Sequence, residues 1–528
     1  MRRTTAMAVL LAAGAGWGQT REKAAALLAG AGEPTPQGAI DEAVFAQLKA
    51  LGLQPARRCS DAVFLRRAYL DVIGTLPTAA EVTQFLDDID PDKRRVLIDR
   101  LLDREEFAVY WAMKWGDLLR VKAEFPINLW PNAVQAYHLY LWAGLQQNKP
   151  YDRFVREQLT ASGSNFRVPP VNFYRSSPGK DPEGLAKTVA LTFMGARADQ
   201  WPRQRLAGMA TFFRYVGRKR TAEWKEEVIF FDSIAAARDA AKGASMAATF
   251  PDGTTSTLRP DVDPRGVFAD WLVAPENPWF APVIANRVWS WLMGRGIVHE
   301  PDDFRPDNPP SNPELLALLA RELVDSGYDL KHLYRLILNS ATYQLSSVPR
   351  SCDPRAAEHF AAYPIRRLDA EVLIDALCQI TGTTESYSSR IPEPFTWIPE
   401  DSRTIALADG SITSPFLEMF GRPPRDTGLE SERSNAASAA QRLHLLNSSH
   451  VLQKINRSGR LRSLMRIKDG DLRPAATRLY LTILSRRPTD EELATVQAYS
   501  EGEETQGQKA LIDLTWALIN SSEFLYRH

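Results

Sequence analysis

The chain has 528 residues, of which 44% are apolar and 24% charged, an ordinary globular composition that excludes a disordered or collagen-like chain. Lysine plus arginine and aspartate plus glutamate both number 64, so the net charge is zero and no overall basic field would attract nucleic acid. Three cysteines allow at most one disulfide and exclude a disulfide-stapled scaffold. At roughly 150 residues per domain, this length indicates two or three domains.

The N-terminus has the pattern of a secretory signal peptide. Two arginines at positions 2 and 3 precede an apolar run over residues 6–16, and small and polar residues follow. We therefore expect a signal peptide over residues 1–19 and export to the periplasm, the cell envelope or the medium; a buried N-terminal helix is the alternative. No later segment has the length and apolar character of a membrane span, so no transmembrane segment is expected after cleavage.

Helical spacing of apolar residues dominates the rest of the chain and predicts a mainly α fold. Two helical domains are expected, at 38–250 and 267–528, with a linker at 251–266 and another at 20–37. Long Pro- and Gly-rich loops are expected at 161–183, 301–313 and 384–432. The best candidate strand is residues 227–232.

Residues 67–107 and 478–524 form an internal repeat, in which Arg, Tyr, Leu, Pro, Thr and Glu coincide at one constant offset. In the first copy Thr78 follows a proline and precedes Glu81 by three residues, which is the pattern of a capping box at a helix start. A shorter Asn-Ser cassette occurs at 338–341, 446–449 and 519–522, where Asn ends one helix and Ser caps the next. Both repeats predict architecture rather than chemistry.

Familiar catalytic signatures are absent: the sequence has no Gly-x-Ser-x-Gly elbow, no phosphate-binding loop and no His-Glu-x-x-His zinc helix. The seven histidines are scattered. His444 and His450 are six residues apart, which does not place two imidazoles on one helical face, so no metal site is expected.

Two polar loops hold the candidate ligand-binding residues. In the first, Arg295 precedes the adjacent acids Asp302 and Asp303, which could hold a cation or act as acid and base. The alternative is a solvated loop in which one of these acids caps a turn, and this structural interpretation is favoured.

The second loop contains the other four candidates, Arg422, Arg425, Glu432 and Arg433. Arginines beside acids in a Pro/Gly loop could bind an anionic ligand such as a carboxylated or sulfated glycan. They could equally pair internally and fix the loop to the helices, which is again the favoured interpretation.

Tryptophans and cysteines give weaker indications. The tryptophans at 111, 115, 271, 279, 289 and 291 could stack on sugar rings, but their helical spacing is more typical of a core. The three cysteines (Cys59, Cys352 and Cys378) are expected to be reduced, with one bridge from Cys59 to either of the others left open.

Several segments together resemble one known family, the planctomycete cytochrome-linked secreted proteins (the PSCyt group). Residues 64–71 (FLRRAYLD) and 150–159 (PYDRFVREQL) resemble its first domain. The second half resembles the usual partner domain of unknown function, through the segments 268–272 (FADWL), 286–289 (NRVW), 294–298 (GRGIV), 301–304 (PDDF), 340–343 (SATY) and 420–423 (FGRP). The resemblance covers roughly residues 38–528.

The resemblance implies no established activity. Many members carry a Cys-x-x-Cys-His haem motif or a cytochrome-like domain, but the corresponding residues 191–201 (LTFMGARADQW) hold no cysteine or histidine, so no haem or other cofactor is expected. The leading hypothesis is an exported, non-enzymatic binding or envelope-associated protein whose partner is an anionic glycan or an envelope protein. The alternative is a polysaccharide-acting enzyme that uses Asp302, Asp303 or Glu432. A redox role by family analogy is disfavoured.

Overall fold

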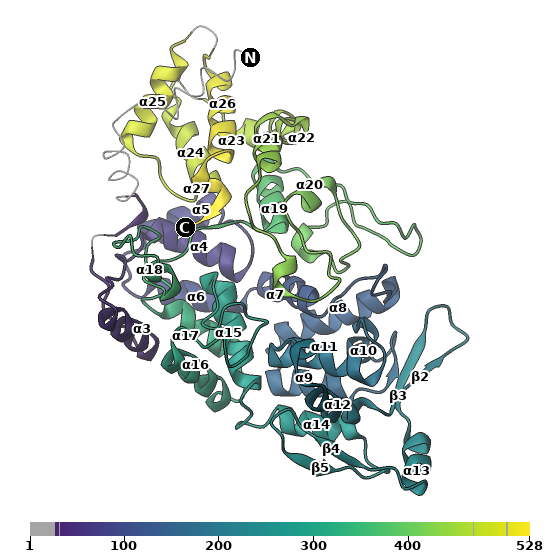
Figure 1. The fold of residues 1–528 in the computed structure, drawn as a ribbon. Helices are drawn as coiled ribbons and strands as arrows, with labels where there is room; N and C mark the ends of the chain where they lie inside the picture. Colours follow the sequence, from purple (N-terminus) through teal and green to yellow (C-terminus); the bar gives the residue numbers. More distant parts are fainter. Residues whose placement is uncertain (1–26, 31, 468, 503–504) are drawn as a thin grey trace.

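The computed structural model describes residues 27–528, apart from 31, 468 and 503–504. The described chain is mainly helical, as predicted (Figure 1). The expected signal peptide lies outside the described residues. None of the described helices combines the length and apolar character needed to cross a membrane.

The helices of the first half are α3 (Ala39–Ala50), α4 (Asp61–Val72), α5 (Ala79–Asp87), α6 (Lys93–Asp103), α7 (Glu105–Leu118), α8 (Pro131–Gln146), α9 (Tyr151–Thr160), α10 (Asn172–Ser176), α11 (Pro182–Met194), α12 (Arg203–Ala210) and α13 (Ser233–Ala241). Those of the second half are α14 (Pro264–Leu272), α15 (Phe280–Met293), α16 (Pro313–Asp325), α17 (Leu330–Asn339), α18 (Arg355–Glu358), α19 (Ala370–Thr381), α20 (Pro415–Met419), α21 (Ala439–Asn447), α22 (Ser449–Arg457), α23 (Gly459–Leu464), α24 (Arg473–Ile483), α25 (Asp490–Ser500), α26 (Gln508–Ile519) and α27 (Ser522–Leu525). Short 3-10 turns are η1 (Pro169–Val171), η2 (Ala198–Gln200), η3 (Thr211–Phe213), η4 (Thr404–Ala406) and η5 (Glu430–Glu432).

Strands are few and short. They are β1 (Gly163–Ser164), β2 (Val216–Arg220), β3 (Glu227–Phe231), β4 (Ala247–Thr249), β5 (Thr255–Thr257), β6 (Arg366–Arg367) and β7 (Tyr526–Arg527). The predicted strand is β3, the centre of an antiparallel sheet in the order β1-β3-β2, with Arg218 opposite Ile229. In Figure 1 the β2–β3 hairpin projects from the side of the molecule.

Local capping residues account for many helix ends. Thr78 and Thr489 each close a capping box, with Glu81 and Glu492, at the same place in the two repeat copies. In the Asn-Ser cassettes, Ser448 accepts the N–H of Val451 at the start of α22. At the start of α4, Ser60 is the cap and accepts the N–H of Val63, while Asp61 is the first helical residue.

The two repeat copies contain equivalent polar clusters. In the first copy the Arg104 guanidinium contacts Glu81 at 3.0 Å and Glu106 at 2.5 Å. In the second, Arg486 contacts Glu492 at 2.7 Å and Glu523 at 2.5 Å. Each arginine also lies over the repeat tyrosine, Tyr69 or Tyr480. Arg104 and Arg486 do not align with one another in the repeat. The equivalent ion pairs are therefore formed by arginines at different positions of the two copies.

The two halves of the chain share one hydrophobic core. Helix α3 packs on α16, α6 on α17 and α5 on α24, so segments far apart in sequence lie side by side (Figure 1). The chain ends inside this arrangement, where β7 pairs with β6. The domain boundaries at 250 and 267 remain a prediction.

Candidate functional site

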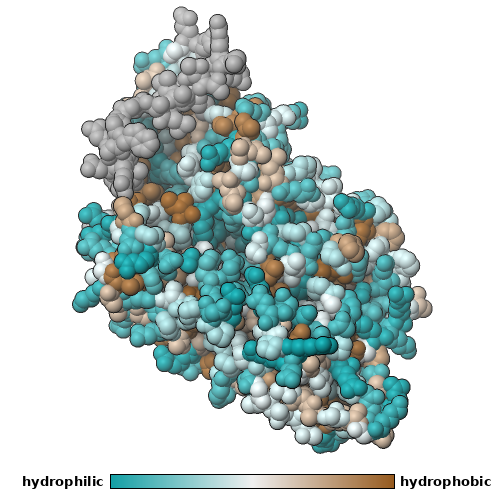
Figure 2. All heavy atoms as spheres, viewed as in Figure 1, coloured by the Kyte–Doolittle hydropathy of each residue, from teal (hydrophilic) through white to brown (hydrophobic). Residues whose placement is uncertain are grey.

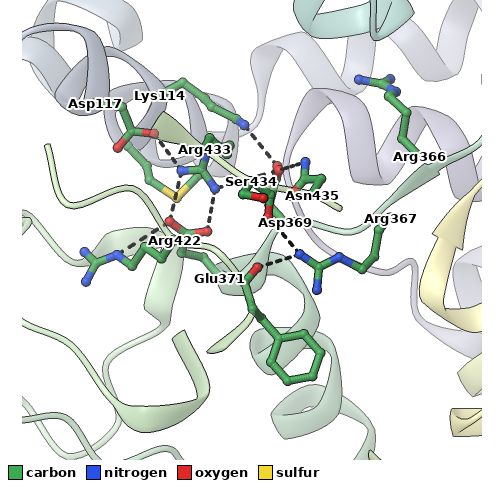
Figure 3. A network of polar contacts seen from close by, with 12 residues as sticks. Lys114, Asp117, Arg366, Arg367, Asp369, Glu371, Arg422, Arg433, Ser434 and Asn435 are labelled. Atoms are coloured by element: carbon green, nitrogen blue, oxygen red, sulfur yellow. Dashed lines mark hydrogen bonds and ion pairs between the residues drawn. The ribbon is translucent and has the colours of Figure 1, made fainter. Parts of the chain in front are cut away.

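A buried group of charged side chains lies where the two halves meet (Figure 3). Helix α7 supplies two members, the residue before α19 and its first turn supply two, and the loop after α20 supplies three. We call it the buried charged cluster, and its members are Lys114, Asp117, Asp369, Glu371, Arg422, Arg425 and Arg433. It therefore joins α7 of the first half to α19 and its neighbouring loop in the second.

Arg433 lies at the centre of this cluster. Its guanidinium is 2.6 Å from the Asp117 carboxylate and 2.7 Å from that of Glu371 (Figure 3). Burial opposes the charged form of Arg433, but Glu371, Asp117 and Asp369 outweigh it and raise its pKa well above the ordinary value. Arg433 therefore remains charged at any physiological pH and holds its loop to both helices.

The Asp369 carboxylate contacts two cations and an amide. The Lys114 ammonium and the Arg527 guanidinium each lie 3.0 Å from its Oδ2, and the Asn435 amide donates to its Oδ1 at 2.9 Å. Burial disfavours the Asp369 carboxylate, but Lys114, Arg527 and Arg433 overcome this and hold its pKa well below the ordinary value.

Arg425 and Arg422 complete the cluster. The Nε of Arg425 donates to Asp117 at 2.8 Å, and its other nitrogens donate to backbone carbonyls, including that of Ala408 at 2.8 Å. Arg422 donates to the carbonyls of Ile412 and Asp409, and burial lowers its pKa to about 10. These three loop arginines thus pair internally, which is the second of the two arrangements that the sequence left open.

The other candidate residues do not join this cluster. Asp302 is buried and accepts hydrogen bonds from Arg287 at 2.8 Å and from the Glu430 N–H at 2.6 Å. Glu432 accepts the N–H of Thr427, and Arg295 lies 3.8 Å from Glu358. Three of the seven candidates therefore share the buried charged cluster, and the other four do not join them in one cleft.

Asp303 alone among these seven lines a surface groove of about 840 Å³. We call it the arginine–tryptophan groove. It lies between η2, the start of α12, the start of α15 and the loop before α16, and its lining includes Arg197, Trp201, Arg205, Trp279, Asp303 and Phe304. Its volume is typical of ligand-binding pockets. On the face shown in Figure 2, hydrophilic residues predominate and hydrophobic groups are scattered.

Stacked aromatic and cationic groups form one wall of the groove. The Arg205 guanidinium lies 4.2 Å from the ring centre of Trp201 and 5.7 Å from that of Trp279. All three side chains are half-buried. Asp303, by contrast, is paired with Arg305 at 3.2 Å. The groove thus offers flat apolar surfaces beside a positive charge.

Arg197 lies at the end of this groove. Its Nε lacks a hydrogen bond, and its side chain forms no ion pair with any residue that the structure describes. Arg205 likewise makes no ion pair in the described chain, and its Nε donates only to the Pro251 carbonyl. Two guanidinium groups therefore remain available to an anionic ligand.

Sequence reasoning did not single out Arg197, Trp201 or Arg205. Trp279 was treated with the other tryptophans, of which Trp111, Trp115 and Trp289 are indeed fully buried. The one available signal was the Trp-Pro pair at 201–202, which has arginines on both sides and follows within seven residues of the glycine that ends α11. The distant Trp279 joins it only through tertiary packing.

His444 and His450 lie on two different helices, yet their rings are close together. A break at Ser448 turns α21 into α22, and this brings His444 Nε2 within 3.3 Å of His450 Nδ1, while His450 Nε2 lies 2.9 Å from Glu385. Along the described chain, no group of three or more His, Cys, Asp or Glu residues has metal-binding geometry. The three cysteines are unbridged.

The structure defines a mainly helical protein whose two halves are joined by a shared hydrophobic core and by the buried charged cluster. Residues 39–207 match the family model PSCyt2, a protein of unknown function (DUF1549), and residues 264–500 match PSD1, a protein of unknown function (DUF1553). The chain thus carries a PSCyt2 domain followed by a PSD1 domain, which confirms the resemblance read from the sequence. A comparison with curated proteins and one with solved structures each found no significant match.

Proposed function

We propose that this protein is an exported binding protein without haem or catalytic activity, which holds an acidic polysaccharide in the arginine–tryptophan groove. The observation that carries the proposal is a pair of guanidinium groups, Arg197 and Arg205, which form no ion pair within the described chain and lie in one groove with the rings of Trp201 and Trp279. Aromatic faces match the apolar faces of sugar rings, and guanidinium groups match carboxylate and sulfate groups.

The state of the acidic side chains favours binding over glycoside hydrolysis. Hydrolysis uses two carboxyl groups on either side of the scissile bond, either roughly 5–5.5 Å or 6.5–9.5 Å apart. In this groove Asp303 is paired with Arg305, while Asp302 is buried against Arg287. Glu432 receives the Thr427 N–H instead of lining the groove. Both acids that line the groove, Asp303 and Asp307, contact the Arg305 guanidinium, at 3.2 and 3.4 Å, and the other two candidate acids lie outside it.

Export and the absence of haem belong to the same proposal. Export is supported by the signal-peptide pattern of residues 1–19, and the absence of haem by residues 191–201, which hold neither cysteine nor histidine. Expression in a bacterium with a periplasm, followed by N-terminal sequencing, tests export. We expect a mature chain that begins near residue 20, and an uncleaved cytoplasmic chain would contradict export.

Calorimetric titration of residues 20–528 tests the binding function. The probes are a carboxylated oligogalacturonide, a sulfated oligosaccharide and a neutral oligosaccharide of equal length. We expect an acidic probe to bind, the neutral one to bind at least tenfold more weakly, and the affinity to fall as salt screens the arginines. The two acidic probes distinguish a uronic acid from a sulfate ester.

Trp279→Ala is the diagnostic variant, and Trp397→Ala is its matched control, because Trp397 is 70% exposed and lies outside the groove. An aromatic contact contributes about 0.5–1.5 kcal/mol beyond its buried area, so losing Trp279 should weaken binding about tenfold. Equal effects of the two substitutions, or no binding of either acidic probe, would overturn the proposal.

A further inference from the structure

We infer that the arginine–tryptophan groove continues past Arg197 into a second cavity, and that the two together form one cleft for a linear acidic chain several sugars long. This inference rests on the proposed function and extends it to the length of the ligand. The second cavity has a volume of about 590 Å³, and Arg197 and Gln200 line both hollows. Its other lining residues include two cations, Arg120 and Lys187, and three acids, Asp181, Glu183 and Asp199.

The segment between the two hollows is held in place by a backbone hydrogen bond and by close packing. Gly195 ends α11 in the left-handed conformation, with φ of 56°, and η2 begins three residues later. The Gly195 carbonyl accepts the N–H of Phe304 at 2.8 Å, and a Cβ at position 195 would lie 3.0 Å from both the Pro301 carbonyl and the Phe304 ring. Arg197 therefore projects from a segment packed directly against a wall of the groove.

The guanidinium at this junction differs from the three loop arginines of the buried charged cluster. Arg422, Arg425 and Arg433 each contact a carboxylate. Arg197, whose Nε is buried without a hydrogen bond, contacts none in the described residues. A carboxylate or sulfate group of a sugar passing between the hollows would supply the missing partner.

The second cavity adds polar groups rather than aromatic ones. Lys187 is exposed on α11 and forms no ion pair with the described residues. Arg120 is fully buried and donates to the Ser176 and Thr427 carbonyls at 3.1 and 3.3 Å, and no described carboxylate lies within ion-pair distance. The Asp181 carboxylate accepts the N–H of Gly184. Cations beside carboxylate and hydroxyl groups bind sugar hydroxyls and acidic substituents together.

Each hollow alone has the volume of a small-molecule pocket, whereas both together would take a longer chain. A short ligand would occupy the aromatic groove, and a longer one would also reach Lys187. The inference therefore predicts that affinity rises with chain length and that the gain depends on the second cavity.

The test compares galacturonic acid oligomers of two and six units on residues 20–528. We expect the hexamer to bind at least tenfold more tightly than the dimer. Lys187→Glu should remove most of that advantage and change dimer affinity less than twofold. Lys49→Glu makes the same charge change at an exposed position of α3, outside both hollows, and should leave both affinities unchanged.

The possible failures are distinguishable. If both oligomers bind with equal affinity and Trp279→Ala weakens both, the proposed function stands and the extended cleft is refuted. If the hexamer binds more tightly but Lys187→Glu behaves like Lys49→Glu, the second cavity is refuted as the source of the gain. If neither oligomer binds the unmodified protein, the proposed function and the inference both fall.

Discussion

Replacing Asp369 by asparagine should reveal what the buried charged cluster contributes to stability. The substitution keeps the size of the side chain but removes the charge that faces Lys114, Arg433 and Arg527. Arg433 would keep Glu371 and Asp117, and Arg527 would keep Asp71 at 3.2 Å. Lys114 would keep no carboxylate within ion-pair distance among the described residues, although its side chain is only 9% exposed. An unpaired buried charge destabilises by about 3–5 kcal/mol.

Urea unfolding followed by tryptophan fluorescence measures this loss, because Trp111 and Trp115 lie on α7 beside Lys114. The matched control is Asp303→Asn, which breaks the more exposed pair with Arg305 and should cost at most about 1 kcal/mol. Lys114→Met in the Asp369→Asn background removes the stranded ammonium. The double variant should therefore be more stable than the sum of the two single losses indicates.

Acidity gives an independent check on the same residue. The pKa of Asp369 is held below its value in the unfolded chain, so its stabilisation is fully present above about pH 4 and is lost as the pH falls toward the folded pKa. The stability gap between the unmodified protein and Asp369→Asn should be constant from about pH 5 to 7 and narrow below about pH 4. The reasoning is refuted if Asp369→Asn costs no more than Asp303→Asn, or if the losses in the double variant simply add.

Two further predictions concern the repeat and the thiols. Gly74 has φ of 60°, and a Cβ there would lie 2.4 Å from the Tyr110 ring, so Gly74→Ala should destabilise by about 1–3 kcal/mol in urea unfolding. The equivalent Ser485 already carries a side chain at φ of 59°, so Ser485→Gly should change stability by less than about 1 kcal/mol, and equal effects would contradict this account. Cys352 is exposed whereas Cys59 is buried, and burial raises the pKa of Cys378. Maleimide labelling of the native protein, located by mass spectrometry, should therefore modify Cys352 first, and faster labelling of either other thiol would contradict the fold around it.

The helices could be predicted because their determinants are local. Thr78 and Glu81 lie three residues apart, as do Thr489 and Glu492. Each pair forms a capping box that does not depend on distant parts of the chain. The same holds for the serine that starts α22. The family could also be recognised from short segments spread over both halves.

The sequence could not predict which charged residues pair with one another, because the partners are separated by up to several hundred residues in the chain. The loop arginines were identified as candidates, but their partners Asp117 and Glu371 lie on two different helices and carry no pattern of their own. His444 and His450 meet because a helix ends between them, which spacing on a single helix cannot describe.

The amino-acid sequence by itself determined the mainly helical class, the repeat with its caps and the family, since each depends on residues close together in the chain. Only the tertiary structure decided which arginines are neutralised inside the protein and which remain available. Arg433 is enclosed between carboxylates of α7 and α19, while Arg197 lies where the start of α12 and the loop before α16 leave a groove open. The two side chains have the same chemistry, and their surroundings, assembled from distant segments, give them different roles.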